Sequence, residues 1–289
     1  YLVLSKENSV WKIVRHISAE RELALRLVDE RSSEARLKLL ADEPSLVNQQ
    51  LVTELTAEGN WKYGQIAWKD VLDIYQISLQ VAEKIKDQRA ISLALNSIGI
   101  TLKDMGEKVK AREAFERSMA ISQSIGDREN IARVTYNMVD VVDNSDEVLD
   151  RALVLARESD NKSFVANALG KTGNRHTMRG EVLQAKQLLE EALQIRKQLG
   201  DPENVSIGLS NLGLVHHSLG NYEEARQLFD ESIKLSTSVD NNFAAMIDLY
   251  NLGNVYKAVG GFAAAASAYQ QSLEAGRKVD PNDENAPVR

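Results

Sequence analysis

Residues 209–236, LSNLGLVHHSLGNYEEARQLFDESIKLS, decide the fold because they have the pattern of two helices joined by a tight turn. In the second half, apolar or small side chains recur at steps of three and four residues, which places them on one face of a helix. These side chains belong to Tyr222, Ala225, Leu228, Phe229, Ser232, Ile233 and Ser236. Gly220 lies between the halves, where a left-handed residue can end the first helix and permit a turn. The stretch therefore predicts a pair of antiparallel helices.

The same unit recurs along the chain at a spacing of 40 residues. The first-helix glycines that mark it are Gly59 and Gly99, and then Gly173, Gly213 and Gly253. In the second helices, three aligned positions carry Ala (111, 185, 225, 265), a large residue (Phe115, Leu189, Phe229, Tyr269) and a small one (Ser118, Ala192, Ser232, Ser272). Small residues let two helices approach closely, and a large neighbour fills the gap. Because one pair cannot bury its apolar face alone, the sequence predicts an all-α, right-handed superhelical solenoid of antiparallel helix pairs.

These aligned residues resemble the tetratricopeptide repeat, which has a small residue in its first helix and the order Ala, aromatic, small in its second. The motif is matched in order by Leu209, Leu212, Gly213, Gly220, Tyr222, Ala225, Phe229 and Ser232, and again by Leu249, Leu252, Gly253, Tyr256, Gly260, Phe262, Ala265, Tyr269 and Ser272. The resemblance covers about residues 50–280. Because the period of 40 residues exceeds the usual length of about 34, the chain resembles the longer-helix subclass found in kinesin light chains and in many bacterial arrays.

Six repeats are expected, at approximately residues 44–87, 88–127, 128–160, 161–201, 202–240 and 241–280. The third is shortened, because Ala152 follows Ser118 by 34 residues rather than 40. Six residues are therefore missing around 141–148, where a tight turn and a helix cap at Ser145 or Asp146 are expected. Residues 1–43 lie outside the period and are expected to be N-terminal capping helices, with a dimerisation or docking helix as the alternative. Residues 281–289 are expected to be a polar tail or linker.

Composition limits the classes of function. The net charge is −7 and both signs are interspersed without a basic block, which argues against a nucleic-acid partner. Cysteine is absent, which excludes disulfides, thiolate catalysis and Cys-ligated zinc in this chain and fits a cytoplasmic protein. No apolar run approaches the roughly 20 residues that cross a bilayer, so no membrane partner is expected. No catalytic triad or phosphate loop can be assembled, and the sequence predicts neither an enzyme nor a cofactor.

Two histidines occupy the same place in successive repeats and could lie near each other. A metal site at His176 and His216 would need further ligands at compatible geometry. His217 is no substitute, because neighbours on a helix point about 100° apart. We expect packed or rim histidines rather than metal ligands.

The resemblance implies that the first helices line an inner groove, at fixed offsets from each repeat glycine or from Val139 in the shortened repeat. The candidate binding residues at these offsets are Arg133, Tyr136 and Asn137 in the third repeat, Lys171 and Asn174 in the fourth, Asn211 and Leu214 in the fifth, and Tyr250, Asn251, Asn254 and Lys257 in the sixth.

Asparagine recurs at two of these offsets. An Asn amide presents a hydrogen-bond donor and an acceptor together, and an extended peptide backbone presents the complementary pair. A ladder of such amides could hold a peptide main chain, while Arg133, Lys171, Leu214 and Tyr250 select its side chains. Alternatively, the same asparagines bond neighbouring helices and fix the stacking of the repeats. The sequence leaves both interpretations open.

The expected function is a non-catalytic protein–protein interaction scaffold that binds a peptide segment or partner protein in the groove. One alternative is a regulatory or sensor module of a larger effector, such as a caspase-like peptidase or a transcription regulator. Another is a small-peptide receptor. Self-association through the N-terminal helix is a further possibility.

Overall fold

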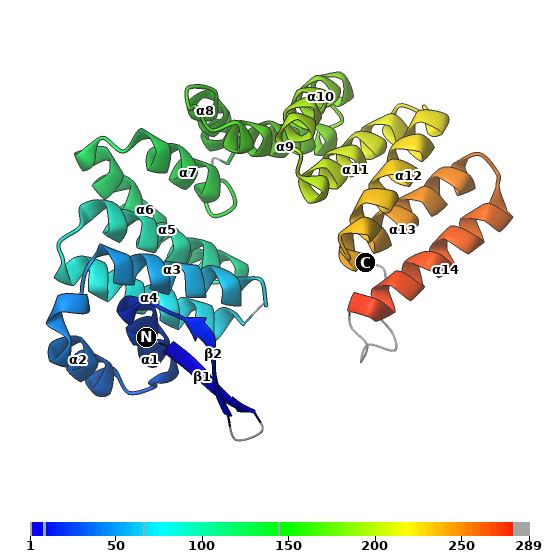
Figure 1. Ribbon diagram of the computed structural model, residues 1–289. Helices are drawn as coiled ribbons and strands as arrows, with labels where there is room; N and C mark the ends of the chain where they lie inside the picture. Colours follow the sequence, from blue (N-terminus) through cyan, green and yellow to red (C-terminus); the bar gives the residue numbers. More distant parts are fainter. Residues whose placement is uncertain (1, 8–9, 66, 144, 280–289) are drawn as a thin grey trace. The chain divides into compact units, whose positions relative to one another are not determined.

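A computed structural model describes residues 2–7, 10–65, 67–143 and 145–279 of the chain (Figure 1). The chain divides into two compact units, residues 1–152 (unit 1) and residues 153–289 (unit 2). Both are built mainly of helices that follow one another as antiparallel pairs. None of the described helices is long and apolar enough to cross a membrane. The expected tail at 281–289 lies outside the described residues.

Unit 1 begins with an antiparallel hairpin of two strands, β1 (Leu2–Glu7) and β2 (Val10–His16). This differs from the expectation of capping helices over residues 1–43, because the first helix begins only at Ala19. The sequence VWKIVRH of β2 is rich in β-branched and aromatic residues, which favour a strand over a helix.

Two helices then cover the start of the repeats, α1 (Ala19–Asp29) and α2 (Ser33–Asp42). The apolar side of α1 packs against α3 (Gln49–Tyr63), and its Leu23 and Leu27 are buried. Arg36 of α2 donates to both carboxylate oxygens of Asp73, at 2.9 and 2.6 Å. Capping of the repeats by this segment and self-association through it both stay predictions.

Helix pairs follow along the chain, with a short 3₁₀ turn at Pro44–Leu46 before the first. In unit 1 they are α3 with α4 (Trp68–Lys84) and α5 (Gln88–Asp104) with α6 (Lys108–Ile125). The third repeat follows with α7 (Arg128–Met138) and α8 (Ser145–Arg157). In unit 2 they are α9 (Lys162–Met178) with α10 (Val182–Leu199), α11 (Pro202–Ser218) with α12 (Tyr222–Ser238), and α13 (Asn242–Ala258) with α14 (Phe262–Val279). We call the first member of each pair its first helix.

The helices of the third repeat are shorter than those of the other repeats. Helices α7 and α8 have 11 and 13 residues, whereas α5 and α6 have 17 and 18. The boundary between the two units falls within α8. Helix α8 begins at Ser145, and the preceding residue, Asn144, lies outside the described part of the chain.

Glycine lets the two helices of a pair approach each other. A Cβ on Gly213 would lie 2.7 Å from the ring of Phe229, and one on Gly99 would lie 2.5 Å from the ring of Phe115. Both rings are fully buried and cannot retreat. A second glycine lies in the turn between the two helices. Gly220 has a φ of 76°, a left-handed conformation that residues with a side chain disfavour.

Candidate functional site

The first helices of unit 2 are α9, α11 and α13. Helix α11 contacts α9 on one side and α13 on the other. Each turns one side toward its own second helix and leaves another side open. The open side of α11 carries Ile207 and Leu214, which are 41% and 37% exposed, and that of α13 carries Ile247 and Tyr250, at 39% and 37%. We define the first-helix face of unit 2 as the predicted residues and these apolar ones: Lys171, Asn174, Ile207, Asn211, Leu214, Ile247, Tyr250, Asn251, Asn254 and Lys257.

Three amides on this face make no hydrogen bond to any other described residue. Asn211 and Asn251 are half-buried and occupy equivalent places on α11 and α13, and Asn174 of α9 is exposed. Each therefore keeps its donors and its acceptor available to water or to a ligand. Leu214 and Tyr250 lie on the same helices and add apolar surface beside the amides.

Asn254 has a different role, because it is bonded within its own hairpin. Its Oδ1 accepts a hydrogen bond from Tyr269 Oη at 2.8 Å. The first repeat has the same pair, in which Tyr75 Oη donates to Asn60 Oδ1 at 2.6 Å. Burial raises the pKa of Tyr75 to about 12, so this donor keeps its proton throughout the neutral range. Asn254 thus supports the structural interpretation of the asparagines.

The three candidates in unit 1 are also engaged within the fold. Asn137 Nδ2 donates to Asn96 Oδ1 at 2.9 Å and so joins α7 to α5. Arg133 is exposed and pairs with Glu129 of the same helix at 2.6 Å, and Tyr136 is half-buried. These three residues belong to unit 1 and are not part of the first-helix face of unit 2.

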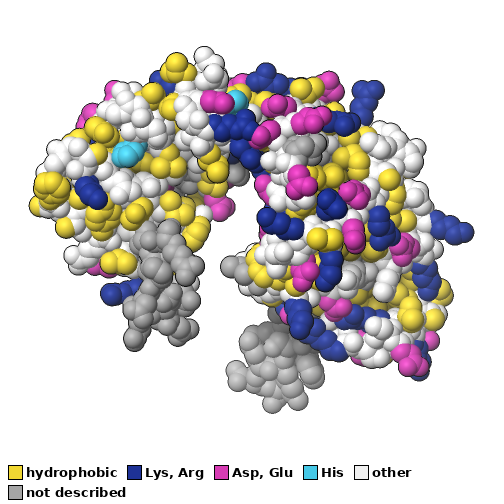
Figure 2. All heavy atoms as spheres, turned by 180° about the vertical axis from the view of Figure 1, so that it is seen from behind, with side chains coloured by type: hydrophobic (Ala, Val, Ile, Leu, Met, Phe, Trp, Pro, Cys, Tyr) yellow, Lys and Arg dark blue, Asp and Glu magenta, His cyan; other side chains and the backbone are white. Residues whose placement is uncertain are grey.

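Charged side chains are few on the first helices of unit 2. Helix α9 contains no acidic residue, and the single acid of α13, Asp248, is buried. Lys257 is exposed and Lys171 half-buried. In Figure 2, the visible surface of unit 2 is mostly yellow and white and shows few charged side chains. The surface therefore suits a partner that buries apolar groups.

His176 and His216, which occupy equivalent positions in successive repeats, have different surroundings. His176 Nδ1 contacts the carboxylate of Glu181, in the turn of its own hairpin. His216 Nδ1 is buried without a hydrogen-bond partner among the described residues, and burial lowers the pKa of its ring, so the ring is neutral at pH 7. The described residues contain no cluster of three or more His, Asp or Glu side chains that could hold a metal ion.

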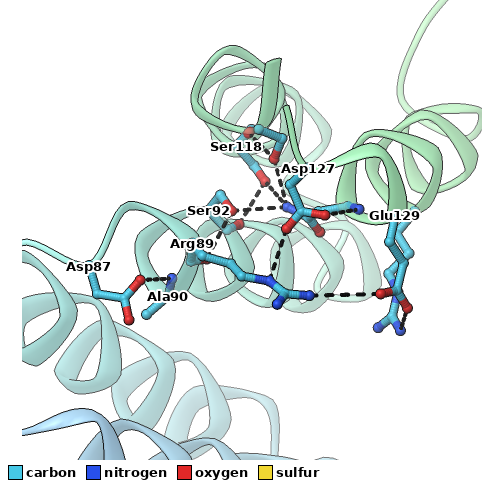
Figure 3. Close-up of polar contacts among 10 residues, drawn as sticks. Asp87, Arg89, Ala90, Ser92, Ser118, Asp127 and Glu129 are labelled. Carbon is cyan, nitrogen blue, oxygen red and sulfur yellow. Dashed lines mark hydrogen bonds and ion pairs between the residues drawn. The ribbon is translucent and has the colours of Figure 1, made fainter. Parts of the chain in front are cut away.

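Two kinds of polar contact were not predicted from the sequence. The first is the helix cap: in Figure 3, Asp87 accepts from the backbone N–H of Ala90 and so caps α5. The sequence contains a signal for it, because Asp or Asn recurs as the cap of each first helix from α5 to α13, at residues 87, 127, 161, 201 and 241. The second joins neighbouring hairpins: Arg89 of α5 forms ion pairs with Asp127 and Glu129 at the start of α7.

A second such contact lies deeper in the same junction. Ser118 Oγ donates to the carbonyl oxygen of Ser92 at 2.6 Å, and Figure 3 shows these two residues turned toward each other. Asn130 of α7 donates to the hydroxyls of Ser92, Ser118 and Ser122. The next hairpin is thereby fastened to both helices of the preceding one.

Comparison with known proteins identifies the repeat. Residues 165–199 and 204–278 each match a tetratricopeptide-repeat sequence profile. Among curated proteins, no sequence matches the chain.

Several solved structures share the fold. The chain is 15% identical to a signal transduction ATPase with numerous domains from Pyrococcus horikoshii that has a tetratricopeptide-repeat sensor; the match covers 93% of this chain and 48% of that one, with a TM-score of 0.64. It is 12% identical to a Rap protein complexed with Competence and Sporulation Factor, over 92% and 89% of the two chains, with a TM-score of 0.61. It is 16% identical to NprR in complex with its cognate peptide NprX, over 95% and 85%, with a TM-score of 0.60.

At these identities the likeness concerns the fold alone. The profile matches cover the helix pairs of unit 2, and the packing of a glycine against a large side chain in those pairs recurs in unit 1. Residues 165–199 and 204–278 are thus tetratricopeptide repeats.

Proposed function

We propose that unit 2 binds a peptide segment of a partner protein on its first-helix face. The observation that carries this proposal is the pair Asn211 and Asn251, whose amides are half-buried at equivalent places of adjacent first helices and bond to no other described residue. Amides that only fixed the stacking would be bonded within the fold, as those of Asn137 and Asn254 are.

The chemistry of the face suits a peptide main chain. Each amide can donate to a peptide carbonyl and accept from a peptide N–H, with a net gain of about 1 kcal/mol per bond. The exposed side chains of Ile207, Leu214, Ile247 and Tyr250 can cover apolar side chains of the peptide. Affinity then comes mainly from apolar burial, and the amides fix the path of the main chain.

The structural relatives support an interaction role. The structure of NprR contains its cognate peptide NprX, and that of the Rap protein contains Competence and Sporulation Factor. Both proteins share the fold over most of this chain. The role proposed for this chain is accordingly non-catalytic.

The test uses a display library of random peptides selected on the full chain. Affinities of the selected peptides are then measured for the wild type and for the double variant Asn211→Ala, Asn251→Ala. Loss of two bonds of about 1 kcal/mol each predicts a Kd about 30-fold weaker, with unchanged thermal unfolding.

The matched control removes two exposed amides from a second helix, Gln194→Ala with Gln198→Ala on α10. This control should bind like the wild type. Selected peptides that bind the double Asn variant as tightly as the wild type would contradict the proposal, as would a library that yields no binder.

A second candidate is a sensor module of a larger protein. It is favoured by the likeness to the Pyrococcus protein, whose repeats are named as its sensor and of which this chain matches about half. Peptide binding on the first-helix face would then serve as the input. Sequencing the gene on both sides of the present chain tests this directly, since an adjoining effector domain is required.

A further inference from the structure

A carboxyl group is buried where the last two hairpins of unit 2 meet, and the proposed binding face does not use it. Asp248 of α13 is 1% exposed. Its Oδ1 accepts a hydrogen bond from Ser210 Oγ of α11, and its Oδ2 lies 2.5 Å from Ser232 Oγ of α12. Through this one side chain, α13 is fastened to both helices of the preceding hairpin.

The hydrogens available at this junction can be counted. Ser232 Oγ carries one hydrogen, yet the carbonyl oxygen of Ser206 at 2.8 Å and Oδ2 of an ionised Asp248 would both need it. The Ser206 carbonyl already accepts a backbone hydrogen bond within α11. If Ser232 donates to this carbonyl, however, Oδ2 of an ionised Asp248 is a buried charged acceptor that faces the serine oxygen at 2.5 Å without a hydrogen between them, which is costly. A proton on Oδ2 removes the conflict, because Asp248 then donates to Ser232 Oγ and Ser232 donates to Ser206. Ser210 can donate to Oδ1 in either state.

The equivalent junction in unit 1 shows what the site requires. There Ser118 donates to the carbonyl of Ser92, as Ser232 does to Ser206 (Figure 3). The side chain that reaches Ser118 from the next hairpin is Asn130, whose Nδ2 lies 3.3 Å from the serine oxygen. An amide N–H is a donor at every pH. Asp248 can supply a comparable donor only while it is protonated.

The surroundings of Asp248 favour the neutral acid. Burial raises the pKa of Asp248 to about 6, although the hydrogen bonds from Ser210 and Ser232 act in the opposite direction. The titratable groups of α13 and of the helices packed against it are Glu203, His216 and His217 on α11, Tyr222, Glu223, Glu224, Arg226, Asp230, Glu231 and Lys234 on α12, Tyr250, Tyr256 and Lys257 on α13, and Tyr269, Glu274, Arg277 and Lys278 on α14. Among the described residues, none of these forms an ion pair with Asp248 or shifts its pKa.

We propose that Asp248 is a proton-operated clamp that holds α13 against α11 and α12. The clamp is closed when the carboxyl is protonated and weakens when it is ionised. It joins the two helices that carry Asn211 and Asn251, so it sets how firmly the first-helix face of unit 2 is assembled. The clamp itself is independent of peptide binding, and only its effect on affinity rests on the proposed function.

The sign of the pH effect follows from the two states. In the closed hairpin the carboxyl titrates near pH 6, and in an opened hairpin it titrates at its ordinary value of 3.8. Between these values the closed state keeps a proton that the open state has lost, so raising the pH favours opening. The opening equilibrium constant should rise about tenfold from pH 5.0 to pH 7.5, with little further change above pH 7.5.

Hydrogen exchange of the full chain measures this opening. After correction for intrinsic exchange rates, backbone amides of α13 and α14 should be about tenfold more protected at pH 5.0 than at pH 7.5. The variant Asp248→Asn keeps an acceptor for Ser210 and supplies a permanent donor to Ser232, so its protection should change less than about twofold. The converse variant, Asn130→Asp, should bring the same pH dependence to α7.

The titration of Asp248 can also be measured by NMR in the wild type, so this test does not depend on the folding of a variant. In the wild type, the ¹³C signals of the aspartate side-chain carboxyls should include one with a midpoint near pH 6. A set of midpoints that all lie below about 4.5 would overturn the clamp, as would equal pH dependence of protection in the wild type and in Asp248→Asn.

The effect on binding is measured with a display-selected peptide. Its affinity for the wild type should be higher at pH 5.0 than at pH 7.5, and the affinity for Asp248→Asn should be nearly constant. If no peptide is selected, the proposed function fails while the exchange and titration results still decide the clamp. Exchange that follows the expectation together with a pH-independent affinity would leave the clamp in place but remove its link to the binding face.

Discussion

Five of the hairpins rely on a glycine that faces a large side chain sixteen residues later. The pairs are Gly59 with Tyr75, Gly99 with Phe115, Gly173 with Leu189, Gly213 with Phe229 and Gly253 with Tyr269. At each of them an added Cβ would come closer than 3 Å to the partner, so the distance between the helices is set by the absence of a side chain. The spacing made this partnership predictable from sequence, because the same two residue types recur together.

Replacing Gly213 by Ala tests this contact. The new Cβ would lie 2.7 Å from Phe229, which is fully buried, and overpacking of this kind costs about 1–3 kcal/mol. Alanine regains about 0.5–1 kcal/mol through its better helix propensity. Urea unfolding should therefore show a net loss of about 1–2 kcal/mol. The control Gly64→Ala, whose Cβ meets no atom closer than 3.5 Å, should change stability by less than about 0.5 kcal/mol. Equal effects of the two variants would show that the contact is not tight.

Other single residues could not be predicted from the pattern. Gly126 and Gly200 are left-handed in the turns between hairpins, but Lys86 and Asp240 have φ values of 59° and 55° in the corresponding turns. A sequence gives no sign of such a conformation when the residue is not glycine. The bonding of the asparagines was equally hidden, because Asn254 needs Tyr269 and Asn137 needs Asn96, and neither partner is adjacent in sequence.

Among the elements, the helices were predictable and the strands were not. The 3.6-residue periodicity marked the repeat helices, and counting residues between Ser118 and Ala152 located the short third pair. The segment before Ala19 has no repeat partner with which to compare it, so the repeat pattern gives no prediction of its two strands. The candidate face was placed by its offset from the repeat glycines, a rule that fixes the side of a helix but not the contacts made there.

Helix starts give a prediction at this scale. Asp201 caps α11 by accepting from the backbone N–H groups of Glu203 and Asn204, and its hydrogen bonds with Asn204 lower the pKa of its carboxyl. Asp201→Ala should cost about 1 kcal/mol of unfolding free energy near pH 7. Because the folded-state pKa is lowered, the contribution of the ionised cap is present above about pH 4 and is lost as the pH falls below it.

The natural caps provide the control for this experiment. Asn161 and Asn241 cap α9 and α13 through the same side-chain oxygen, so Asp201→Asn should keep most of the stability and lose the pH dependence. Denaturant unfolding of both variants at pH 3 and pH 7 separates the two effects. An Asn variant as unstable as the Ala variant would mean that the charge of Asp201, and not its hydrogen bonds, stabilises the helix.

For the molecule as a whole, the arrangement of hairpins predicts local rather than global effects of a lesion. Each hairpin of a repeat protein contacts mainly its neighbours, so stability is nearly a sum of local terms. Gly99→Ala in unit 1 would press on Phe115, and Gly253→Ala in unit 2 would press on Tyr269. In hydrogen exchange, Gly99→Ala should lower the protection of α5 and α6 and leave that of α13 and α14 unchanged, and Gly253→Ala should do the reverse. The crossed design makes each variant the control of the other. An equal fall of protection in both units with either variant would show that the chain unfolds as one cooperative body, and the additive description of its repeats would then be wrong.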